Sequence, residues 1–172
     1  MAISTSKFVQ RYLFSEQLFR TTINPESERT MNVSARVEYA CLAVMDLAEN
    51  YGSGRPVQIR KIAQTHGIPS KFLVQILLQL KGAGLVTSTR GALGGYELIC
   101  DPNEITLADV MSVIEGPQGL FSYNASTITP STRALSEAWE EAAEAQQERL
   151  AGLTFSELLV RAKDQAAIMY YI

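Results

Sequence analysis

Apolar residues recur at intervals of three and four over much of the chain, and this spacing predicts a mainly helical protein. The first clear helix begins after Ser34, whose side chain can cap it, and ends at the glycine-rich turn of residues 51–56. Residues 1–30 show no such periodicity. We interpret them as an N-terminal extension, either a short amphipathic helix or a disordered arm; a misplaced start codon would also explain them.

Two short helices joined by a glycine turn follow. The first covers about residues 58–66, and the second begins at Pro69, which suits the first helical position, and ends near residue 82. Gly67, in the turn between them, can take a positive φ. The core-facing residues of the second helix are expected to be Phe72, Leu73, Ile76, Leu77 and Leu80.

The period then changes from helical spacing to that of β-strands. Residues 85–89 and 96–100 are typical of two short strands, and the glycine-rich segment between them carries Arg90. Two short helices followed by a hairpin match a winged helix-turn-helix. We therefore predict a mainly α fold with a small β-hairpin wing, in which residues 31–117 form the winged helix-turn-helix domain.

A different arrangement is expected after the wing. Thr106 and Asp109 form a capping-box pattern that opens a further helix. Residues 118–130 are small and polar and suit a linker. Residues 131–172 are predicted to contain a long helix from Ser131 or Thr132 to about residue 151, a short helix, and an apolar C-terminal tail. We expect the long helix to dimerise with Trp139 as its anchor, or else to pack within its own subunit.

The charge is distributed unevenly. The 172-residue chain has a net charge of −3, but residues 50–96 contain six basic residues and no Asp or Glu. Residues 97–172 contain four basic and twelve acidic residues. A surface cleared of carboxylates favours the approach of a polyphosphate such as DNA, although a short window can also lack acidic residues by chance.

Several classes of protein are disfavoured. No apolar run approaches the roughly 18–20 residues that a membrane span needs. Two cysteines and one histidine are too few for an ordinary zinc or iron–sulfur site. We find no nucleophile–base pair, phosphate-binding loop or dinucleotide-binding fingerprint. With no secretory signal and no cysteine framework, we expect a cytoplasmic protein that is not an enzyme and binds no membrane.

The helix-turn-helix and the wing suggest specific DNA contacts. The second helix would enter the major groove and bring Ser70, Lys71 and Gln75 to base edges and phosphates. Arg90 at the wing tip would enter a minor groove, and Ser88 and the backbone N–H of Gly91 would bind phosphates. The alternatives are that Gln75 and Gln79 are ordinary solvated helix residues and that the hairpin is only a turn.

Several segments resemble the Rrf2 family of bacterial regulators: MNVSARVEYA at residues 31–40, IPSKFLVQIL at 68–77 and LVTSTRGALGGY at 85–96, continued by residues 105–117. The resemblance implies a dimeric transcription factor that binds a palindromic operator. It implies DNA contacts by the recognition helix, by the wing and by the N-terminal part of the first helix: Lys71, Phe72, Gln75, Ser88, Arg90, Gly91, Ser34 and Arg36.

The resemblance also bears on cofactors. Iron–sulfur members of this family place three cysteines before the long helix, whereas residues 115–133 contain none here. We interpret Cys41 and Cys100 as core or incidental residues. His66, in the helix-turn-helix turn, is either a surface residue or a phosphate contact. We therefore predict no cluster, no other cofactor and no metal.

The C-terminus suggests a partner. Tyr170, Tyr171 and Ile172 resemble the end of a cluster-free family member that represses cysteine metabolism. A free carboxylate on an apolar residue can mimic an amino-acid substrate, so the tail could dock into cysteine synthase. The alternative is that it packs on its own dimer. We predict a repressor, with control of cysteine or sulfur metabolism as one role. The alternative function is an interaction adaptor that works through the tail.

Overall fold

The computed structural model describes residues 33–91, 93–116 and 127–169. The chain divides into two units, Met1–Val33 and Ser34–Ile172, and the helices and strands described here belong to the second. The predicted N-terminal extension, most of the predicted linker and the tail residues Tyr170, Tyr171 and Ile172 lie outside the described residues. No helix in the described part of the chain is long and apolar enough to cross a membrane.

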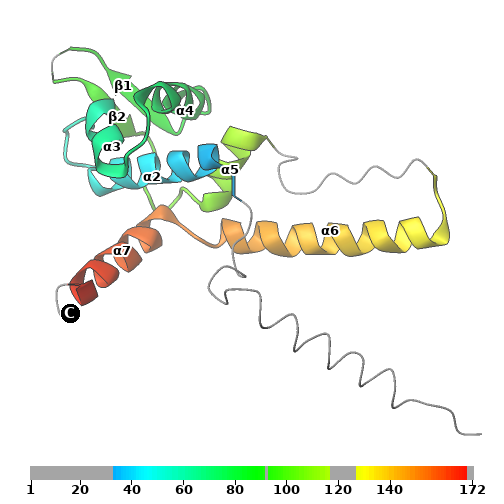
Figure 1. Ribbon diagram of the computed structural model, residues 1–172. Coiled ribbons are helices and arrows are strands. Elements are labelled where there is room, and N and C mark those ends of the chain that lie inside the picture. Colours follow the sequence, from blue (N-terminus) through cyan, green and yellow to red (C-terminus); the bar gives the residue numbers. More distant parts are fainter. Residues whose placement is uncertain (1–32, 92, 117–126, 170–172) are drawn as a thin grey trace, which may run out of the picture. The chain divides into compact units, whose positions relative to one another are not determined.

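Helix α2 (Ala35–Glu49) is the central element of the fold, as Figure 1 shows. Ser34 begins it as predicted, because its Oγ accepts a hydrogen bond from the Val37 N–H at 3.3 Å. One face of the helix is buried through small and branched side chains, which allows close packing. This face consists of Val37, Ala40, Ala43, Val44, Leu47 and Ala48. Around it α2 contacts α4, α5, α7 and β2.

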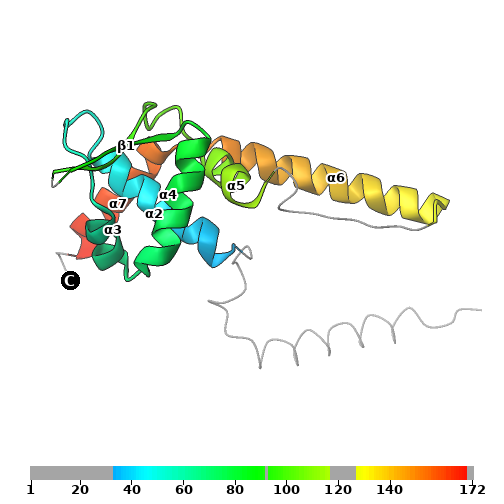
Figure 2. The ribbon, with the colours of Figure 1, turned by 90° about the horizontal axis from the view of Figure 1, so that it is seen from above.

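Helices α3 (Ile59–His66) and α4 (Ser70–Gly82) form the predicted helix-turn-helix. Gly67 ends α3 with φ of 65°, the left-handed conformation that glycine adopts without steric cost. Pro69 precedes α4 as its N-cap with extended backbone, so the prediction that it occupies the first helical position is wrong by one residue. Figure 2 shows α4 running across α2, with α3 beside it.

Strands β1 (Val86–Thr89) and β2 (Gly95–Leu98) form an antiparallel hairpin with Val86 opposite Leu98. The hairpin is shorter than expected, because the predicted strand residues 85, 99 and 100 lie outside the strands. Val57, before α3, extends the sheet by one bridge: it exchanges two hydrogen bonds with Tyr96, at 2.8 and 2.9 Å. The wing is therefore attached to the helix-turn-helix through its second strand.

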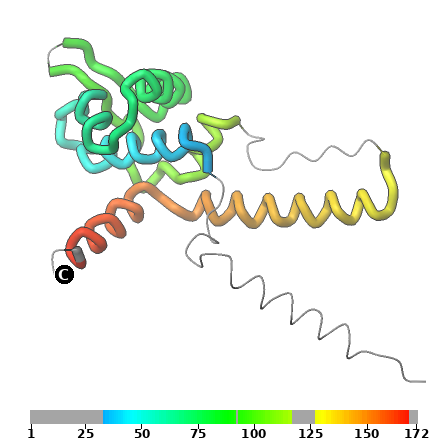
Figure 3. The backbone as a smooth tube through the Cα atoms, in the orientation of Figure 1, coloured from blue at the N-terminus to red at the C-terminus, as the bar shows by residue number. Residues whose placement is uncertain are grey.

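The remaining helices complete the fold (Figure 3). Helix α5 (Leu107–Glu115) begins with the predicted capping box of Thr106 and Asp109. Helix α6 (Pro130–Ala151) begins slightly before the predicted start, because Thr129 and Thr132 form a second capping box. Helix α7 (Phe155–Met169) follows a short turn. Phe155 N–H donates to the carbonyl oxygen of Ile105 at 3.0 Å, which ties the start of α7 to the segment before α5.

A single hydrophobic core joins these elements. Its largest fully buried side chains come from α2, α3, α4, the segment before α5 and α7: Phe155, Leu47, Ile62, Leu73, Ile76, Leu77, Leu80 and Ile105. Cys41 is half-buried against this core, and burial raises the pKa of its thiol to about 11. This position agrees with the interpretation of Cys41 as a core residue.

Candidate nucleic-acid interface

The outer face of α4 carries a row of three polar side chains, two of which, Lys71 and Gln75, were predicted to contact DNA. Lys71, Gln75 and Gln79 follow one another at four-residue spacing and are all exposed. The opposite face is buried through Leu73, Ile76, Leu77 and Leu80. The core therefore fixes α4 by one side and leaves the side that carries Lys71 and Gln75 open to a partner.

Phe72 does not lie in the core, so the prediction that it faces inward is wrong. Its side chain is 39% exposed. Its ring lies 6.4 Å from that of Tyr39 on α2, at 47°, and the Lys71 ammonium lies 5.2 Å from the ring centroid. Phe72 packs against Tyr39, which is itself only partly buried beside the core, so Phe72 lies at the margin of the core. A DNA contact by Phe72 stays a prediction.

The beginning of α2 is linked to the end of α4. Arg36 Nη2 donates a hydrogen bond of 2.9 Å to Gln79 Oε1, across 43 residues of sequence. Ser34 is exposed, and its Oγ accepts the capping hydrogen bond while its O–H is left to donate. Of the two residues predicted to contact the DNA backbone near the N-terminus of α2, Arg36 therefore lies beside the recognition helix, and Ser34 caps the same helix end two positions before it.

The wing is linked to the same helix at its other end. Lys81 Nζ donates a hydrogen bond of 2.6 Å to Ser88 Oγ, which connects the last turn of α4 to β1. Ser88 was predicted to bind phosphate, whereas Lys81 was not singled out. Its place among the six basic residues of the acid-free segment was the signal that could have identified it. An ammonium has three donors, so this bond leaves two of them available.

The wing tip exposes Arg90 and Gly91. Gly91 has φ of 115°, which side-chain-bearing residues rarely adopt, and its carbonyl accepts a 3.0 Å hydrogen bond from Gly94. Ala92 lies outside the described residues. Within the part of the chain that the structure describes, Arg90 forms no ion pair or hydrogen bond, so its guanidinium group is available at the tip.

His66 has a structural partner. Its Nε2 lies 3.0 Å from Oδ1 of Asp46 on α2, and both side chains are largely buried. This contact joins the end of α3 to the last turn of α2. His66 is therefore neither an unengaged surface residue nor a side chain free to reach phosphate with this nitrogen.

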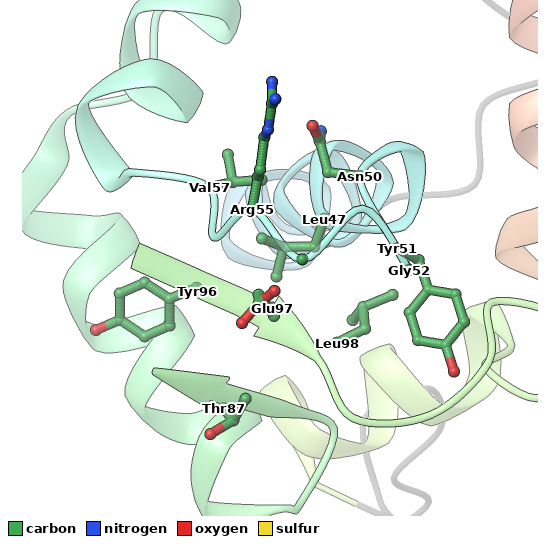
Figure 4. Close-up of a pocket in the computed structure, with 11 residues that line it drawn as sticks. Leu47, Asn50, Tyr51, Gly52, Arg55, Val57, Thr87, Tyr96, Glu97 and Leu98 are labelled. Atoms are coloured by element: carbon green, nitrogen blue, oxygen red, sulfur yellow. The ribbon is translucent and has the colours of Figure 1, made fainter. Parts of the chain in front are cut away.

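A cavity of about 340 Å³ lies between the end of α2, the loop that follows it and the wing (Figure 4). Leu47, Val57 and Leu98 line its apolar part, and Arg55 and Glu97 also border it. In Figure 4 the Arg55 side chain points away from the strand that carries Glu97. The charged groups that border the cavity do not converge as they do in a typical small-molecule site.

Comparison with known proteins identifies the family. The family model "Rrf2: Iron-dependent Transcriptional regulator" matches residues 33–161. The HTH-type transcriptional regulator CymR of Bacillus subtilis is 34% identical over 143 residues, which are 83% of this chain and 100% of CymR. The chain belongs to the Rrf2 family. IscR of Aliivibrio salmonicida is 36% identical over 85 residues, 49% of this chain and 50% of IscR.

Solved structures give the same result. The structure described as CymR, the global cysteine regulator of B. subtilis, matches with a TM-score of 0.66 and 32% identity, over 77% of this chain and 98% of that one. T. potens IscR matches with a TM-score of 0.65 and 31% identity, over 78% of this chain and 90% of that one. This Rrf2 protein is therefore a DNA-binding transcriptional regulator with a winged-helix fold, and it is not an enzyme.

The description of the family as iron-dependent raises the question of a metal site. Among the residues that the structure describes, no group of three or more His, Cys, Asp or Glu side chains could hold a metal ion. A cysteine binds metal as thiolate, whereas burial raises the pKa of Cys41 and favours its thiol form. His66 is paired with Asp46. The described residues therefore do not fit a cluster.

Proposed function

We propose that this Rrf2 protein is a dimeric repressor that binds a palindromic operator in the cytoplasm without an iron–sulfur cluster. The observation that carries the proposal is a pair of hydrogen bonds, Arg36 to Gln79 and Lys81 to Ser88. Together they join the start of α2, the outer face of α4 and the wing. Three separate predicted contact regions thus become one surface, in a part of the chain rich in exposed cations.

Each region of this surface has a role in the proposal. Lys71 and Gln75, with Ser70, contact base edges in the major groove, where lysine suits guanine and glutamine suits adenine. Ser34, Arg36, Ser88 and the N–H of Gly91 contact the backbone and fix the register. Arg90 enters the neighbouring minor groove, whose narrow A·T-rich stretches concentrate negative potential.

Helix α6 supports the dimeric assembly. Over its 22 residues only Leu150, at its end, is buried. Leu135 is 46% exposed and Trp139 is 43% exposed. A long helix with so little packing of its own gains most of its stability from a partner helix. Two copies that pair through α6 would place their recognition helices about 34 Å apart, one turn of DNA.

The test is selection of bound sequences from a random DNA library with the full-length protein. We expect an inverted repeat, and an affinity that falls steeply as salt rises, because phosphate contacts release counterions. Arg90→Ala should weaken binding to the selected repeat by about 1–3 kcal/mol. An adaptor for which DNA binding is secondary would show neither the repeat nor the salt dependence, and either absence would overturn the proposal.

The proposed absence of a cluster is tested by purification without exposure to oxygen. We expect a colourless protein with no bound iron or acid-labile sulfide. Visible absorption together with stoichiometric iron would contradict it. A Cys41→Ala, Cys100→Ala double variant is the control, because it should bind the operator as tightly as the original chain does.

We also propose a more specific role for this regulator, the control of cysteine or sulfur metabolism. It is supported by the likeness to CymR, over the whole length of that protein, and by the apolar C-terminus that ends in Ile172. We propose that Tyr170, Tyr171 and Ile172 dock into cysteine synthase. Deleting Ile172 should abolish binding to purified cysteine synthase while operator binding by the free protein is unchanged. Equal binding by the deletion variant would overturn this part.

A further inference from the structure

The exposed face of α4 carries two aliphatic side chains that the polar contacts leave unexplained. Val74 is 41% exposed and Leu78 is 57% exposed. They are four residues apart and therefore neighbours on one face of the helix. Neither belongs to the hydrophobic core or to the half-buried residues packed against it. They form an apolar stripe, here called the Val74–Leu78 stripe, beside Lys71 and Gln75.

The surroundings of the stripe indicate what covers it. Lys71 and Lys81 are exposed on the same helix, and Arg36 is hydrogen-bonded to Gln79 next to Leu78. No Asp or Glu occurs between residues 50 and 96. A second copy of the chain on this face would bring like charges together, whereas a polyanion would neutralise them. Charge complementarity therefore favours nucleic acid as the occupant.

The major groove offers an aliphatic side chain one specific partner. Of the four bases, only thymine presents a methyl group there, while the other edges present hydrogen-bond donors and acceptors. In a helix-turn-helix the N-terminal part of the recognition helix reaches the base edges. Val74 lies in that part, four residues after Ser70 and three after Lys71, and Leu78 continues the stripe by one turn.

We propose that the Val74–Leu78 stripe selects thymine, by packing against the C5-methyl group of at least one thymine in each half-site, with Val74 as the principal contact. This inference rests on the proposed function, because it requires α4 to lie in the major groove. It adds an apolar specificity contact to the polar ones of Lys71 and Gln75. The operator would then contain an A·T pair that no hydrogen bond from α4 explains.

The test replaces single thymines by deoxyuracil, which removes the methyl group and nothing else. The probe is the inverted repeat that the full-length protein selects from a random library, with each thymine substituted symmetrically in both half-sites. We expect one position at which the original chain loses about fourfold in affinity for each methyl group, the factor that burial of one such group gives. Val74→Ala should bind both probes equally, and Val74→Ile should keep the sensitivity.

The outcomes separate this inference from the proposed function. A tight, specific operator complex that no uracil substitution weakens would overturn the inference alone. So would a uracil effect that is equal in the original chain, in Val74→Ala and in Leu78→Ala. Weakened self-association of these variants would assign the stripe to a protein interface instead. A library that yields no preferred sequence would overturn the proposed function, and this inference with it. Thermal unfolding confirms that the variants are folded, because both positions are exposed.

Discussion

The ammonium of Lys81 is hydrogen-bonded to the hydroxyl of Ser88 at 2.6 Å, so the last turn of α4 and the first strand of the wing are held together at the protein surface. The two residues are seven positions apart, on either side of the turn that ends the recognition helix. Ser88 accepts this bond, and the exposed Lys81 ammonium keeps two further donors. The pair thus suits a phosphate contact in which Lys81 carries the charge and Ser88 positions it.

Replacing Lys81 by methionine tests this division of roles. We expect the variant to bind all DNA sequences more weakly by a similar factor, and its salt slope to fall by about 1, the effect of one lost phosphate contact. Ser88→Ala should keep the slope and lose less affinity. The matched control is Lys163→Met, because Lys163 is an exposed lysine on α7. DNA titrations at several salt concentrations measure the affinity of all three variants. An unchanged dependence of affinity on salt for Lys81→Met would refute the phosphate contact.

Local motifs in the sequence were sufficient to predict most of the helices of the fold. Ser34 caps α2 and the Thr106–Asp109 box opens α5, because each motif involves residues only three positions apart. Gly67 ends α3 because its own backbone takes the left-handed conformation. The buried face of α4 followed from its spacing, except at Phe72, which packs against the half-buried Tyr39 of α2 rather than in the core.

Contacts between distant residues could not be predicted in this way. Arg36 and Gln79 are 43 positions apart, and Asp46 and His66 are 20 apart, so no local pattern links either pair. No local pattern indicated that Val57 bridges to Tyr96 of β2 either. The DNA-contact residues were predicted from type and place, and the structure adds how they are held: Arg36 by Gln79, and Ser88 by Lys81.

The contact between His66 and Asp46 should stabilise the helix-turn-helix. In the intact protein His66 Nε2 lies 3.0 Å from Oδ1 of Asp46, and His66→Ala would leave this oxygen without its partner. The other carboxylate oxygen of Asp46, Oδ2, already has no hydrogen-bond partner among the described residues. We expect a loss of about 1–2 kcal/mol in the free energy of unfolding. Gln64→Ala, an exposed change on the same helix, is the control. Urea unfolding compares them, and equal stabilities would show that the contact is unimportant.

Gly95 is required by the attachment of the wing. A Cβ atom at this position would lie 2.5 Å from the carbonyl oxygen of Val57, a backbone atom that cannot move independently. Gly95→Ala should therefore break the bridge between Val57 and Tyr96, cost about 1–3 kcal/mol of stability and weaken DNA binding by displacing Arg90. Gly82→Ala is the matched control, because nothing lies within 4 Å of a Cβ there. A Gly95→Ala variant as stable as Gly82→Ala would contradict this account.

Burial of Cys41 predicts a pH dependence of stability. The pKa of the thiol rises from 9.0 to about 11 on folding, because the thiolate is poorly solvated against the core. A raised pKa means that the folded state holds its proton more tightly. The stability that the buried thiol of Cys41 contributes is therefore fully present below pH 9.0, and it is lost as the pH rises towards about 11. Unfolding of the original chain and of Cys41→Ala across this range should show a difference that shrinks with pH, whereas a constant difference would exclude the effect.

The assembly through α6 is tested most directly at Trp139. This side chain is 43% exposed in the single chain, and Leu135, four residues before it on the same helix face, is 46% exposed. Buried aromatic anchors often supply much of the energy of an interface, so Trp139→Ala should cost about 2 kcal/mol or more of dimer stability. Sedimentation at micromolar concentration should then show monomers, with unchanged helix content. Operator affinity should fall while affinity for an isolated half-site is kept. Glu140→Ala, at the next position, is the control. A Trp139→Ala variant that sediments as a dimer would place the contact elsewhere on the chain.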